Sequence, residues 1–388
     1  MKPELLVPCH DFATLKAGVK AGADAVYFGV NDFNMRAKNF KIKDLPEVIK
    51  YCHETEVKAY LTVNAVVYED EIKQVKQLLE NAKQASVDAV IVHDLAVLKL
   101  AKDLGLEVHV STQANITNSV AVNLYADLGA SRVILSRELS LEQIKEVVKN
   151  SSIPVEVFIH GAMCVSISGR CFFSQAMLLK NANRGECLQP CRRQWTVTNQ
   201  DGELIYDGER FLNSKDLCMI DHVKELLELG VASFKIEGRM RDPNYVSTVA
   251  SVYREAIDGL PDNKWHKRLE SVFNRGFCTG FYYNLPDSEV NLEFGNNLSS
   301  VKKVKAGVVI NYFKEPSVAV LKLDESGLKV GDEVMIIDSN IFLKQIVRSL
   351  EVEHQSVKQV SKGGFVGLKV NEPVRKGAII YKLETNSN

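Results

Sequence analysis

The chain has 388 residues, of which 46% are hydrophobic and 25% are charged, and its net charge is −1. This length predicts two domains, and the composition is typical of a globular protein. The charge excludes a globally basic nucleic-acid binder but leaves a local basic patch open. No apolar run approaches the length of a membrane span, so we expect no membrane association.

The first residues and the cysteine count bear on the compartment. The stretch MKPELLVPCHDF lacks the charged and then apolar segments of a signal peptide. Without such a signal, eight cysteines indicate reduced thiols and ligands rather than a disulfide framework. We therefore expect a cytoplasmic protein.

Short apolar runs alternate with helical patterns over the first 260 residues. Their length and their content of Val, Ile, Phe and Tyr predict strands that are buried on both faces. The eight runs are Leu5–Pro8, Ala25–Val30, Lys58–Asn64, Ala89–His93, Glu107–Ser111, Arg132–Ser136, Val155–His160 and Ser233–Glu237. Helix caps are expected at Asp11 and Ser140. Eight strand–helix units predict an α/β fold, a (β/α)8 TIM-like barrel, with a doubly wound open sheet as the alternative.

The chain divides into three predicted parts. Residues 1–260 form the barrel, and residues 161–232 are a long loop within it that carries four cysteines. Residues 261–300 are a bridging segment. Residues 301–388 contain short strands separated by glycine-containing turns, which predicts a small C-terminal β-barrel. Such a barrel either binds RNA or another protein domain, or it is only a structural appendage.

Polar residues follow most of the predicted barrel strands. Because active sites of such barrels lie at the C-terminal ends of the strands, these residues are expected to form a polar mouth. The alternative is that each one caps a helix or meets solvent. The residues are Asn64, His93, Asp94, Ser111 to Gln113, Ser136 to Glu138, His160, Glu237 and Arg239.

Four cysteines lie in the loop after the seventh strand. Cys164, Cys171, Cys187 and Cys191 have six, fifteen and three residues between successive members. Thiolates are the natural ligands of iron–sulfur clusters, and four of them complete one cubane. A four-cysteine zinc site and metal-free buried thiols are the alternatives. The position of the loop predicts that a metal or cluster would lie above the barrel mouth.

Several blocks of the sequence resemble the peptidase U32 family. The stretch EVFIHGAMCVSISGRCFFS is similar to the family signature at Glu156, Phe158, Gly161, Ala162, Cys164, Gly169, Cys171 and Ser174. NRGECLQPCRRQW and FNRGFCTGFY resemble further blocks, and ELLVPCHDFATLKAGVKAGADAVYFG resembles the opening of the family. The resemblance covers the barrel almost end to end and extends to the C-terminal part.

The resemblance implies two different activities. The family name records a peptidase assignment, with collagenase-like members. Other members are oxygen-independent hydroxylases that carry a [4Fe–4S] cluster and act on tRNA wobble uridine, on a ribosomal RNA cytidine or on a ubiquinone precursor. In the RNA-acting members, prephenate is the implied oxygen source. The chain is thus expected to be an RNA hydroxylase of tRNA or rRNA, with a U32-type peptidase or a cluster-bearing accessory protein as alternatives.

The resemblance also implies the cluster ligands. Carried over by motif, they are Cys164, Cys171, Cys187 and Cys191. Cys218 lies in the same loop and is the alternative fourth ligand. The CLQPC spacing resembles that of the tRNA-modifying members and favours Cys191.

Three strand-end residues are candidates for catalysis. His160 ends the seventh strand shortly before Cys164 and is a candidate acid or base, with a structural histidine as the alternative. Glu237 and Arg239 end the eighth strand and are candidates for orienting a ribose, a phosphate or a carboxylate such as that of prephenate. Their alternative is a structural ion pair. His160 and Cys164 also form a conceivable peptidase pair, but no local serine-triad or HExxH motif is present.

A local RNA footprint would require basic residues near the same loop. Arginines are suited to phosphate contacts, although pairing with carboxylates inside the fold is the alternative. The candidates are Arg170, Arg184, Arg192, Arg193, Arg239, Arg241 and Arg275.

Overall fold

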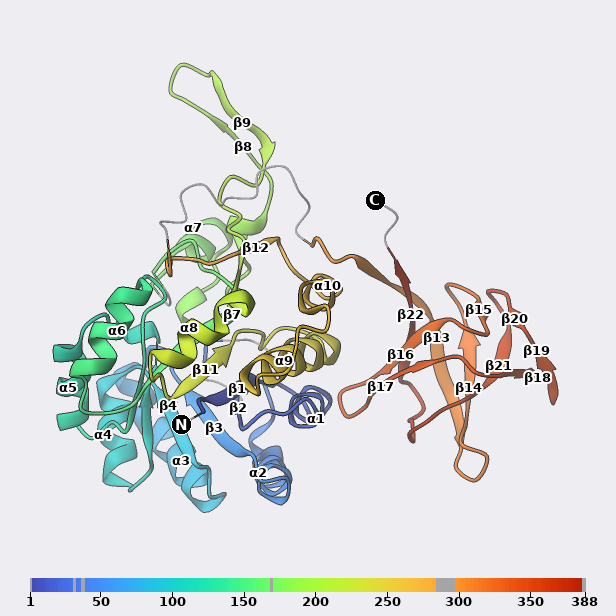
Figure 1. The fold of residues 1–388 in the computed structure, drawn as a ribbon, viewed down its shortest axis with the longest axis horizontal. Helices are drawn as coiled ribbons and strands as arrows, with labels where there is room; N and C mark the ends of the chain where they lie inside the picture. Colours follow the sequence, from blue (N-terminus) through green and yellow to red (C-terminus); the bar gives the residue numbers. More distant parts are fainter. Residues whose placement is uncertain (1, 31–32, 36–38, 168–169, 284–296, 386–388) are drawn as a thin grey trace.

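Two hydrophobic cores organise the chain in the computed structural model, which describes residues 2–30, 33–35, 39–167, 170–283 and 297–385. The larger core lies within residues 5–282 and the smaller one within residues 306–380. Figure 1 shows a helix-covered barrel beside a separate β-structure, to which the smaller core belongs. No helix in these described ranges is long and apolar enough to cross a membrane.

Eight parallel strands close into the predicted barrel. They are β1 (Glu4–Pro8), β2 (Ala25–Phe28), β3 (Lys58–Val63), β4 (Ala89–Val92), β5 (Val108–Val110), β6 (Arg132–Ile134), β7 (Val155–Ala162) and β11 (Ser233–Ile236). The order is β11–β1–β2–β3–β4–β5–β6–β7, and β11 also pairs in parallel with β7. This last ladder closes the sheet and excludes the open doubly wound alternative.

Helices surround the barrel, as Figure 1 shows. They are α1 (Phe12–Lys20), α2 (Leu45–Glu54), α3 (Ile72–Gln84), α4 (Leu95–Asp103), α5 (Ser119–Asp127), α6 (Leu141–Asn150), α8 (Val223–Glu228) and α9 (Pro243–Ile257). Short 3-10 turns lie at Ile42–Asp44, Glu69–Glu71, Thr112–Ala114 and Ile220–His222. The predicted caps are confirmed, because Asp11 accepts a hydrogen bond from the Thr14 amide and Ser140 accepts one from the Gln143 amide.

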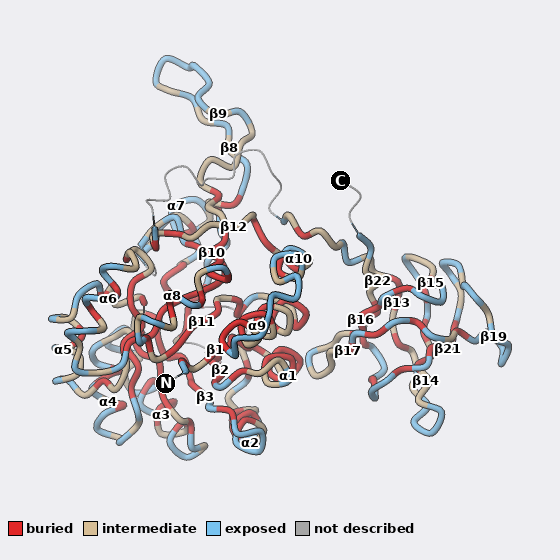
Figure 2. The backbone as a smooth tube through the Cα atoms, in the orientation of Figure 1, coloured by how far each residue is buried: buried red, intermediate tan, exposed pale blue. Residues whose placement is uncertain are grey.

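The segment between β7 and β11 has structure of its own. It contains α7 (Phe173–Leu178), 3-10 turns at Ala182–Arg184 and Pro190–Arg192, and the strands β8 (Trp195–Thr198), β9 (Leu204–Glu209) and β10 (Asp216–Cys218). β10 runs antiparallel to the end of β7 and parallel to β12 (Phe277–Cys278). β8 and β9 form a hairpin that projects away from the barrel and is largely exposed (Figures 1 and 2).

The C-terminal part is an antiparallel sheet domain that follows α10 (Trp265–Glu270) and β12. Its main sheet has the order β17–β16–β22–β13–β14–β21–β18–β19. The strands are β13 (Val301–Phe313), β14 (Val318–Leu323), β16 (Glu333–Ile337), β17 (Phe342–Ile346), β18 (Leu350–Val352), β19 (Gln355–Val357), β21 (Phe365–Lys369) and β22 (Ile379–Thr385). A separate pair is formed by β15 (Leu328–Lys329) and β20 (Gln359–Val360).

One side chain links the edge strand β17 to the far part of this sheet. The Gln345 amide nitrogen donates to the Lys369 carbonyl at 2.8 Å, and its amide oxygen accepts from the Asn371 amide at 2.9 Å. Gln345 is buried. The sheet therefore curves far enough for β17 to meet the end of β21 through a side chain.

The sheet domain contacts the barrel at α1 and α9. The Ala13 amide donates to the Ser339 carbonyl at 3.1 Å, and Lys20 pairs with Glu372 at 3.0 Å. Lys303 of β13 pairs with Asp242, the residue that caps α9. These contacts hold the start of β13 next to the C-terminal side of the barrel.

Candidate functional site

A small cavity of about 40 Å³ opens at the C-terminal ends of the barrel strands. Side chains from the ends of β3, β5, β6 and β11 line it. The polar ones are Thr62, Asn64, Ser111, Thr112, Gln113, Arg137, Lys235, Glu237 and Arg239, and Tyr27 and Phe158 are among the others. Part of the predicted polar mouth is therefore present, including Glu237 and Arg239. The predicted His93, Asp94, Ser136, Glu138 and His160 are not among the described residues that line this cavity.

Hydrogen bonds fix one wall of this mouth. The Asn64 amide nitrogen donates to Ser111 Oγ at 3.3 Å and to Gln113 Oε1 at 3.2 Å. Ser111 Oγ also donates to Gln113 Oε1. The Asn64 amide oxygen accepts from the Met35 backbone amide at 3.3 Å. Side chains from the ends of β3 and β5 are thus held in fixed orientations above the barrel.

Arg239 is buried beneath the segment that follows β2. Its Nη1 donates to Thr62 Oγ1 at 3.1 Å, and its Nη2 donates to the side-chain oxygens of Asn34, at 2.7 Å, and of Asn39. A Cβ atom on Gly29 would lie 2.6 Å from Nη2 and 2.5 Å from Asn39 Oδ1. The missing side chain at Gly29 leaves the room that the guanidinium occupies. Arg239 therefore ties the end of β11 to the loop after β2.

Glu237 directly follows β11 and lies next to Gly161 near the end of β7. The Tyr27 hydroxyl donates to the Ile236 carbonyl at 2.8 Å and lies 3.5 Å from Glu237 Oε2. Gly161 has a φ of 107°, and a Cβ there would lie 2.5 Å from the Glu237 carbonyl oxygen. Only glycine accommodates both this conformation and this contact.

His160 does not face the mouth. Its Nδ1 lies 3.3 Å from the Tyr253 hydroxyl, and its ring packs against Tyr245, Tyr253 and Phe277. Burial, and to a lesser degree the charge of Arg241, lowers the pKa of His160 to about 3. The imidazole is therefore neutral near pH 7 and lies against α9, which favours the structural alternative for this residue.

A buried charge network fills the barrel below the mouth, and sequence reasoning did not find it. Lys235 Nζ lies 2.9 Å from Glu156, and Arg132 Nη1 lies 3.3 Å from Glu156 and 2.6 Å from Glu4. Burial alone would raise the pKa of Glu156, but Lys235 and Arg132 outweigh it and hold the pKa below its ordinary value. The available signal was a charged residue at an interior position of two apolar strands, in VEVFI and SFKI.

Lys235 belongs to both the network and the mouth. Burial lowers its pKa, and the charge of Glu156 opposes this effect. Its ammonium group also lies 4.3 Å from the centre of the Tyr27 ring. The Lys235 side chain thus places a positive charge at the wall of the mouth cavity. Its ion pair with Glu156 fixes this charge to the barrel interior.

The four predicted cysteines lie near one another on the segment after β7. Cys164 and Cys187 are exposed, and Cys171 and Cys191 are partly exposed. Burial raises the pKa of Cys191, the charge of Arg192 lowers it, and the charges of the other three thiols raise it further. Cys191 therefore lies within electrostatic range of each of the other three thiols of the motif.

Hydrogen bonds around α7 position two of these thiols. The Phe173 amide donates to Cys171 Sγ at 3.5 Å. Ser174 Oγ lies 4.0 Å from Cys187 Sγ and accepts from the Leu188 amide at 3.1 Å. The start of α7 thus holds both thiols near the same helical turn.

Arginines anchor the cysteine segment over the barrel. Arg184 donates to the Val66 carbonyl at 2.7 Å and pairs with Glu71, and both partners lie on the loop after β3. Arg192 is buried and donates to the carbonyls of Ser214, at 2.8 Å, and of Met163. Because the segment begins after β7 and is held to the loop after β3, it spans the C-terminal face of the barrel.

Cys218 lies apart from this group. It is buried on β10, opposite His160 in the β7–β10 ladder, and the Tyr253 hydroxyl is 3.8 Å from its sulfur. Burial raises its pKa to about 11. These contacts give Cys218 a place in the core beside α9, whereas Cys191 lies with the other three thiols.

The donor set suits a cluster in kind and number, since one segment supplies four thiols. In the ranges that the structure describes, no three histidine, cysteine or carboxylate side chains are already arranged as a metal site. Formation of a cluster would therefore require the thiols to draw closer together. Gly169, which the family signature includes, lies outside the described residues.

The candidate RNA-contacting arginines divide into three groups. Arg184, Arg192, Arg239 and Arg275 are engaged inside the fold, and Arg275 pairs with Asp216 at 2.9 Å. Arg170 and Arg193 are exposed beside the cysteines. Arg241 is half-buried at the start of α9. Exposed apolar side chains lie on the cysteine segment as well, namely Val165, Ile167, Phe172, Met177, Leu179 and Leu188.

Comparisons with known proteins bear on this site. A model of peptidase family U32 matches residues 10–292. The chain is 44% identical to an uncharacterized protease of Methanocaldococcus jannaschii and 35% identical to a collagenase of Porphyromonas gingivalis, and each match covers 98% of both chains. It is 34% identical to tRNA hydroxylation protein P1 of Bacillus subtilis, over 86% of this chain and 83% of that one. The predicted resemblance is confirmed: the chain belongs to peptidase family U32.

Proposed function

We propose that the protein is an iron–sulfur-dependent, oxygen-independent RNA hydroxylase that acts on the wobble uridine of tRNA at carbon 5. The observation that carries the proposal is a set of four thiols, with Cys191 in electrostatic range of the other three, on a segment that is held across the C-terminal face of the barrel. The identity of 34% to a protein named for tRNA hydroxylation supports the same substrate class.

Cys164, Cys171, Cys187 and Cys191 would hold a [4Fe–4S] cluster. When bound, the cluster would supply the redox chemistry that hydroxylation without dioxygen needs. The net change replaces one C–H of the base by C–OH, and prephenate would donate the oxygen and accept the two electrons. The placement of Cys218 against Tyr253 supports Cys191 as the fourth ligand.

The residues around the thiols suit an unstacked base. Phe172 directly follows Cys171, and 71% of its surface is exposed, so a flipped pyrimidine would stack on its ring. Arg170 and Arg193 are exposed nearby and would contact phosphates. Lys235 and Glu237 line the mouth cavity and would orient a polar group of the substrate. Arg239 would act through the loop after β2 that it holds in place.

A peptidase is the second candidate because two relatives carry protease or collagenase in their names. A cysteine peptidase needs its nucleophile within hydrogen-bond reach of a base. His160 bonds to Tyr253 and is surrounded by rings on the α9 side, whereas Cys164 is exposed. This arrangement does not support His160 and Cys164 as a catalytic pair.

The decisive experiment combines RNA analysis with iron analysis. Nucleosides of tRNA and rRNA are quantified by mass spectrometry in three strains: intact, lacking the gene, and carrying only a Cys164→Ala copy. The proposal predicts loss of a hydroxylated uridine from tRNA in the second and third strains. Protein purified without air should contain about four irons per chain. Unchanged nucleosides in both strains, together with peptide cleavage by iron-free protein, would replace the proposal with the peptidase candidate.

A further inference from the structure

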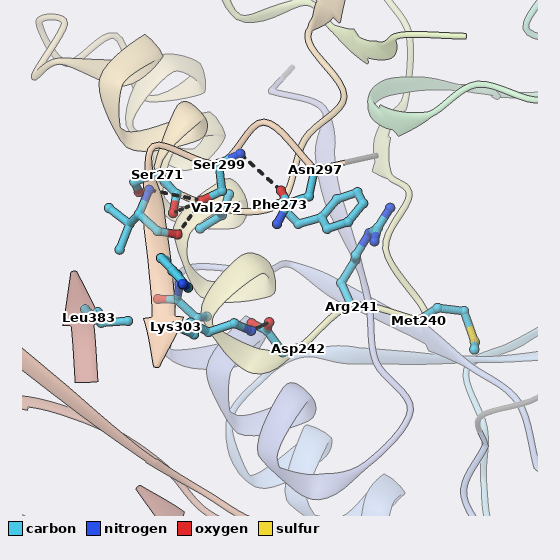
Figure 3. Close-up of a pocket in the computed structure, with 13 residues that line it drawn as sticks. Met240, Arg241, Asp242, Ser271, Val272, Phe273, Asn297, Ser299, Lys303 and Leu383 are labelled. Carbon is cyan, nitrogen blue, oxygen red and sulfur yellow. Dashed lines mark hydrogen bonds and ion pairs between the residues drawn. The ribbon is translucent and has the colours of Figure 1, made fainter. Parts of the chain in front are cut away.

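A cleft of about 500 Å³ lies between the barrel and the sheet domain, as Figure 3 shows. One wall comes from the residues between β11 and α9 and from the segment after α10, and the other wall comes from β13 and β22. Among the described lining residues, Arg241, Lys302 and Lys303 are cationic and Asp242 is the one carboxylate. Three positive charges and one negative charge give these residues a net charge of +2.

Arg241 is the central cation of this cleft. Its guanidinium carbon lies 3.5 Å from the centre of the Phe273 ring, and Figure 3 shows the two side chains beside each other. Burial lowers the pKa of Arg241, and Arg275 adds to this effect. The nearby carboxylate of Asp216 is already paired with Arg275 at 2.9 Å. No ion pair joins Arg241 to a carboxylate among the residues whose structure is described.

The first turn of α9 faces the same cleft. This helix has 15 residues, and its N-terminal end carries partial positive charge. Pro243 has no amide hydrogen and the Val246 amide donates to the Asp242 carbonyl at 3.2 Å. The carboxylate of Asp242 caps the Tyr245 amide at 3.0 Å and is paired with Lys303, so it is locally neutralised. Asn244, in the first turn of the helix, lines the cleft and is only 9% exposed, so its side-chain amide is positioned at the wall of the cleft.

We propose that the cleft binds a phosphate group, with Arg241 as its main cation and Asn244 as a neutral donor. A guanidinium, an amide and a helix N-terminus together form the arrangement that phosphate oxygens favour. Lys302 is exposed at the rim and adds a longer-range attraction. The phosphate belongs either to an RNA backbone or to a small phosphorylated molecule. This inference goes beyond the proposed function, because it holds whether or not the protein hydroxylates RNA.

Binding of three phosphate probes tests the proposal. Inorganic phosphate, uridine 5′-monophosphate and a short single-stranded RNA are titrated calorimetrically at constant ionic strength, with chloride as the baseline. Arg241→Met should weaken binding by about tenfold or more, because a charge-assisted pair of hydrogen bonds is lost. Lys302→Met should weaken it a few-fold. Arg348→Met removes an exposed arginine of the sheet domain, away from the cleft, and should leave binding unchanged.

Further variants separate binding from folding. Arg241→Lys retains the charge and should retain part of the affinity. Asn244→Asp changes little in volume but brings a negative charge to the phosphate, and it should abolish binding even if Arg241→Met does not fold. Thermal melting without ligand shows which variants are folded. Wild-type protein that binds none of the probes more tightly than chloride, or folded Arg241→Met and Asn244→Asp variants with unchanged affinity, would overturn the proposal.

The probes also identify the source of the phosphate. Tight binding of RNA with weak binding of the two small probes assigns the cleft to a nucleic-acid backbone. Tight binding of the small probes with no competition from RNA assigns it to a phosphorylated metabolite. None of these titrations needs iron or catalysis, so a failure of the hydroxylase proposal and a failure of the cleft proposal give different results.

Discussion

Lys235 and Glu156 form an ion pair inside the barrel, with Nζ 2.9 Å from Oε1 and both side chains almost fully buried. Arg132 approaches the second oxygen of Glu156 at 3.3 Å, so this carboxylate balances two cations. Lys235 also lines the mouth cavity. The pair therefore connects the stability of the barrel interior to the position of a charge in the candidate site.

Glu156→Gln tests how much this ion pair contributes to the stability of the folded protein. The substitution leaves two buried cations with one fewer counter-charge, and the free energy of unfolding should fall by about 3–5 kcal/mol. Chemical denaturation monitored by circular dichroism measures the change. Glu54→Gln is the matched control, because Glu54 pairs with Lys50 at 3.7 Å on the surface, and it should cost about 1 kcal/mol at most. Equal losses of unfolding free energy in the two variants would contradict a stabilising role of the buried ion pair.

Gly161→Ala tests the contact between the ends of β7 and β11. The new Cβ would combine a strained φ of 107° with a separation of 2.5 Å from the Glu237 carbonyl oxygen. Gly202→Ala is the control, since its φ is 83° but no heavy atom lies within 4 Å of the added Cβ. Both variants should lose about 1–2 kcal/mol through backbone strain. Gly161→Ala should lose roughly 1–3 kcal/mol more through the clash, and similar melting curves would refute this explanation.

His160 should make the stability depend on pH. Its pKa is about 3 in the folded protein and near 6.5 when exposed, so its contribution is full above pH 6.5. As the pH falls from 6.5 towards 3, the unfolded chain binds a proton that the folded chain does not, and stability declines. The slope should be on the order of 1 kcal/mol per pH unit.

The variant His160→Gln should lack this slope, whatever its absolute stability. Urea denaturation of both proteins at several values between pH 7 and pH 4 measures the difference. His354→Asn, at an exposed position of the sheet domain, should keep the slope of the wild-type protein. If the unfolding free energies of the wild type and of His160→Gln changed in parallel with pH, His160 would not be shielded from protons in the folded protein.

The barrel could be predicted from sequence because each strand is short, apolar and buried on both faces. The ion pair of Lys235 and Glu156 was not predicted, because each residue is a single charge within an apolar run and its partner lies on a neighbouring strand. The direction of His160 depends on a register shift between Lys235 and Ile236 in the β7–β11 ladder. Such a shift changes which face a side chain occupies, and no local pattern reveals it.

The polar mouth also depends on contacts between residues far apart in the sequence, which the sequence alone does not reveal. The members that directly follow a strand, such as Asn64, Glu237 and Arg239, could be predicted, whereas Thr62 and Lys235 lie inside strands and could not. The partners of the predicted members could not be predicted either, since Arg239 is held by Asn34 and Asn39, about 200 residues earlier in the chain. The C-terminal strands were predicted only as a group. FLKQI and LEV, which form β17 and β18, are short and carry weak alternation, so neither could be placed individually.

The last prediction concerns the cysteines. Alanine substitution of Cys164, Cys171, Cys187 or Cys191 should each abolish retention of iron and sulfide, because an incomplete ligand set leaves the cluster labile. Cys218→Ala should retain both, since its thiol lies with Tyr253 and not with the other four. Cys52→Ala is the matched control for a buried thiol elsewhere, in α2, where burial raises the pKa to about 12.

Iron and sulfide are determined on each variant after purification without air, beside a melting curve that shows whether the barrel is folded. Loss of stability without loss of iron in Cys218→Ala would agree with its place in the core. Loss of iron in Cys218→Ala together with retention in Cys191→Ala would show that the fourth ligand comes from β10. That result would require β10 to leave its ladder with β7, because Cys218 now lies opposite His160 there. A zinc site would instead appear as one equivalent of zinc, without sulfide, lost in the same four variants.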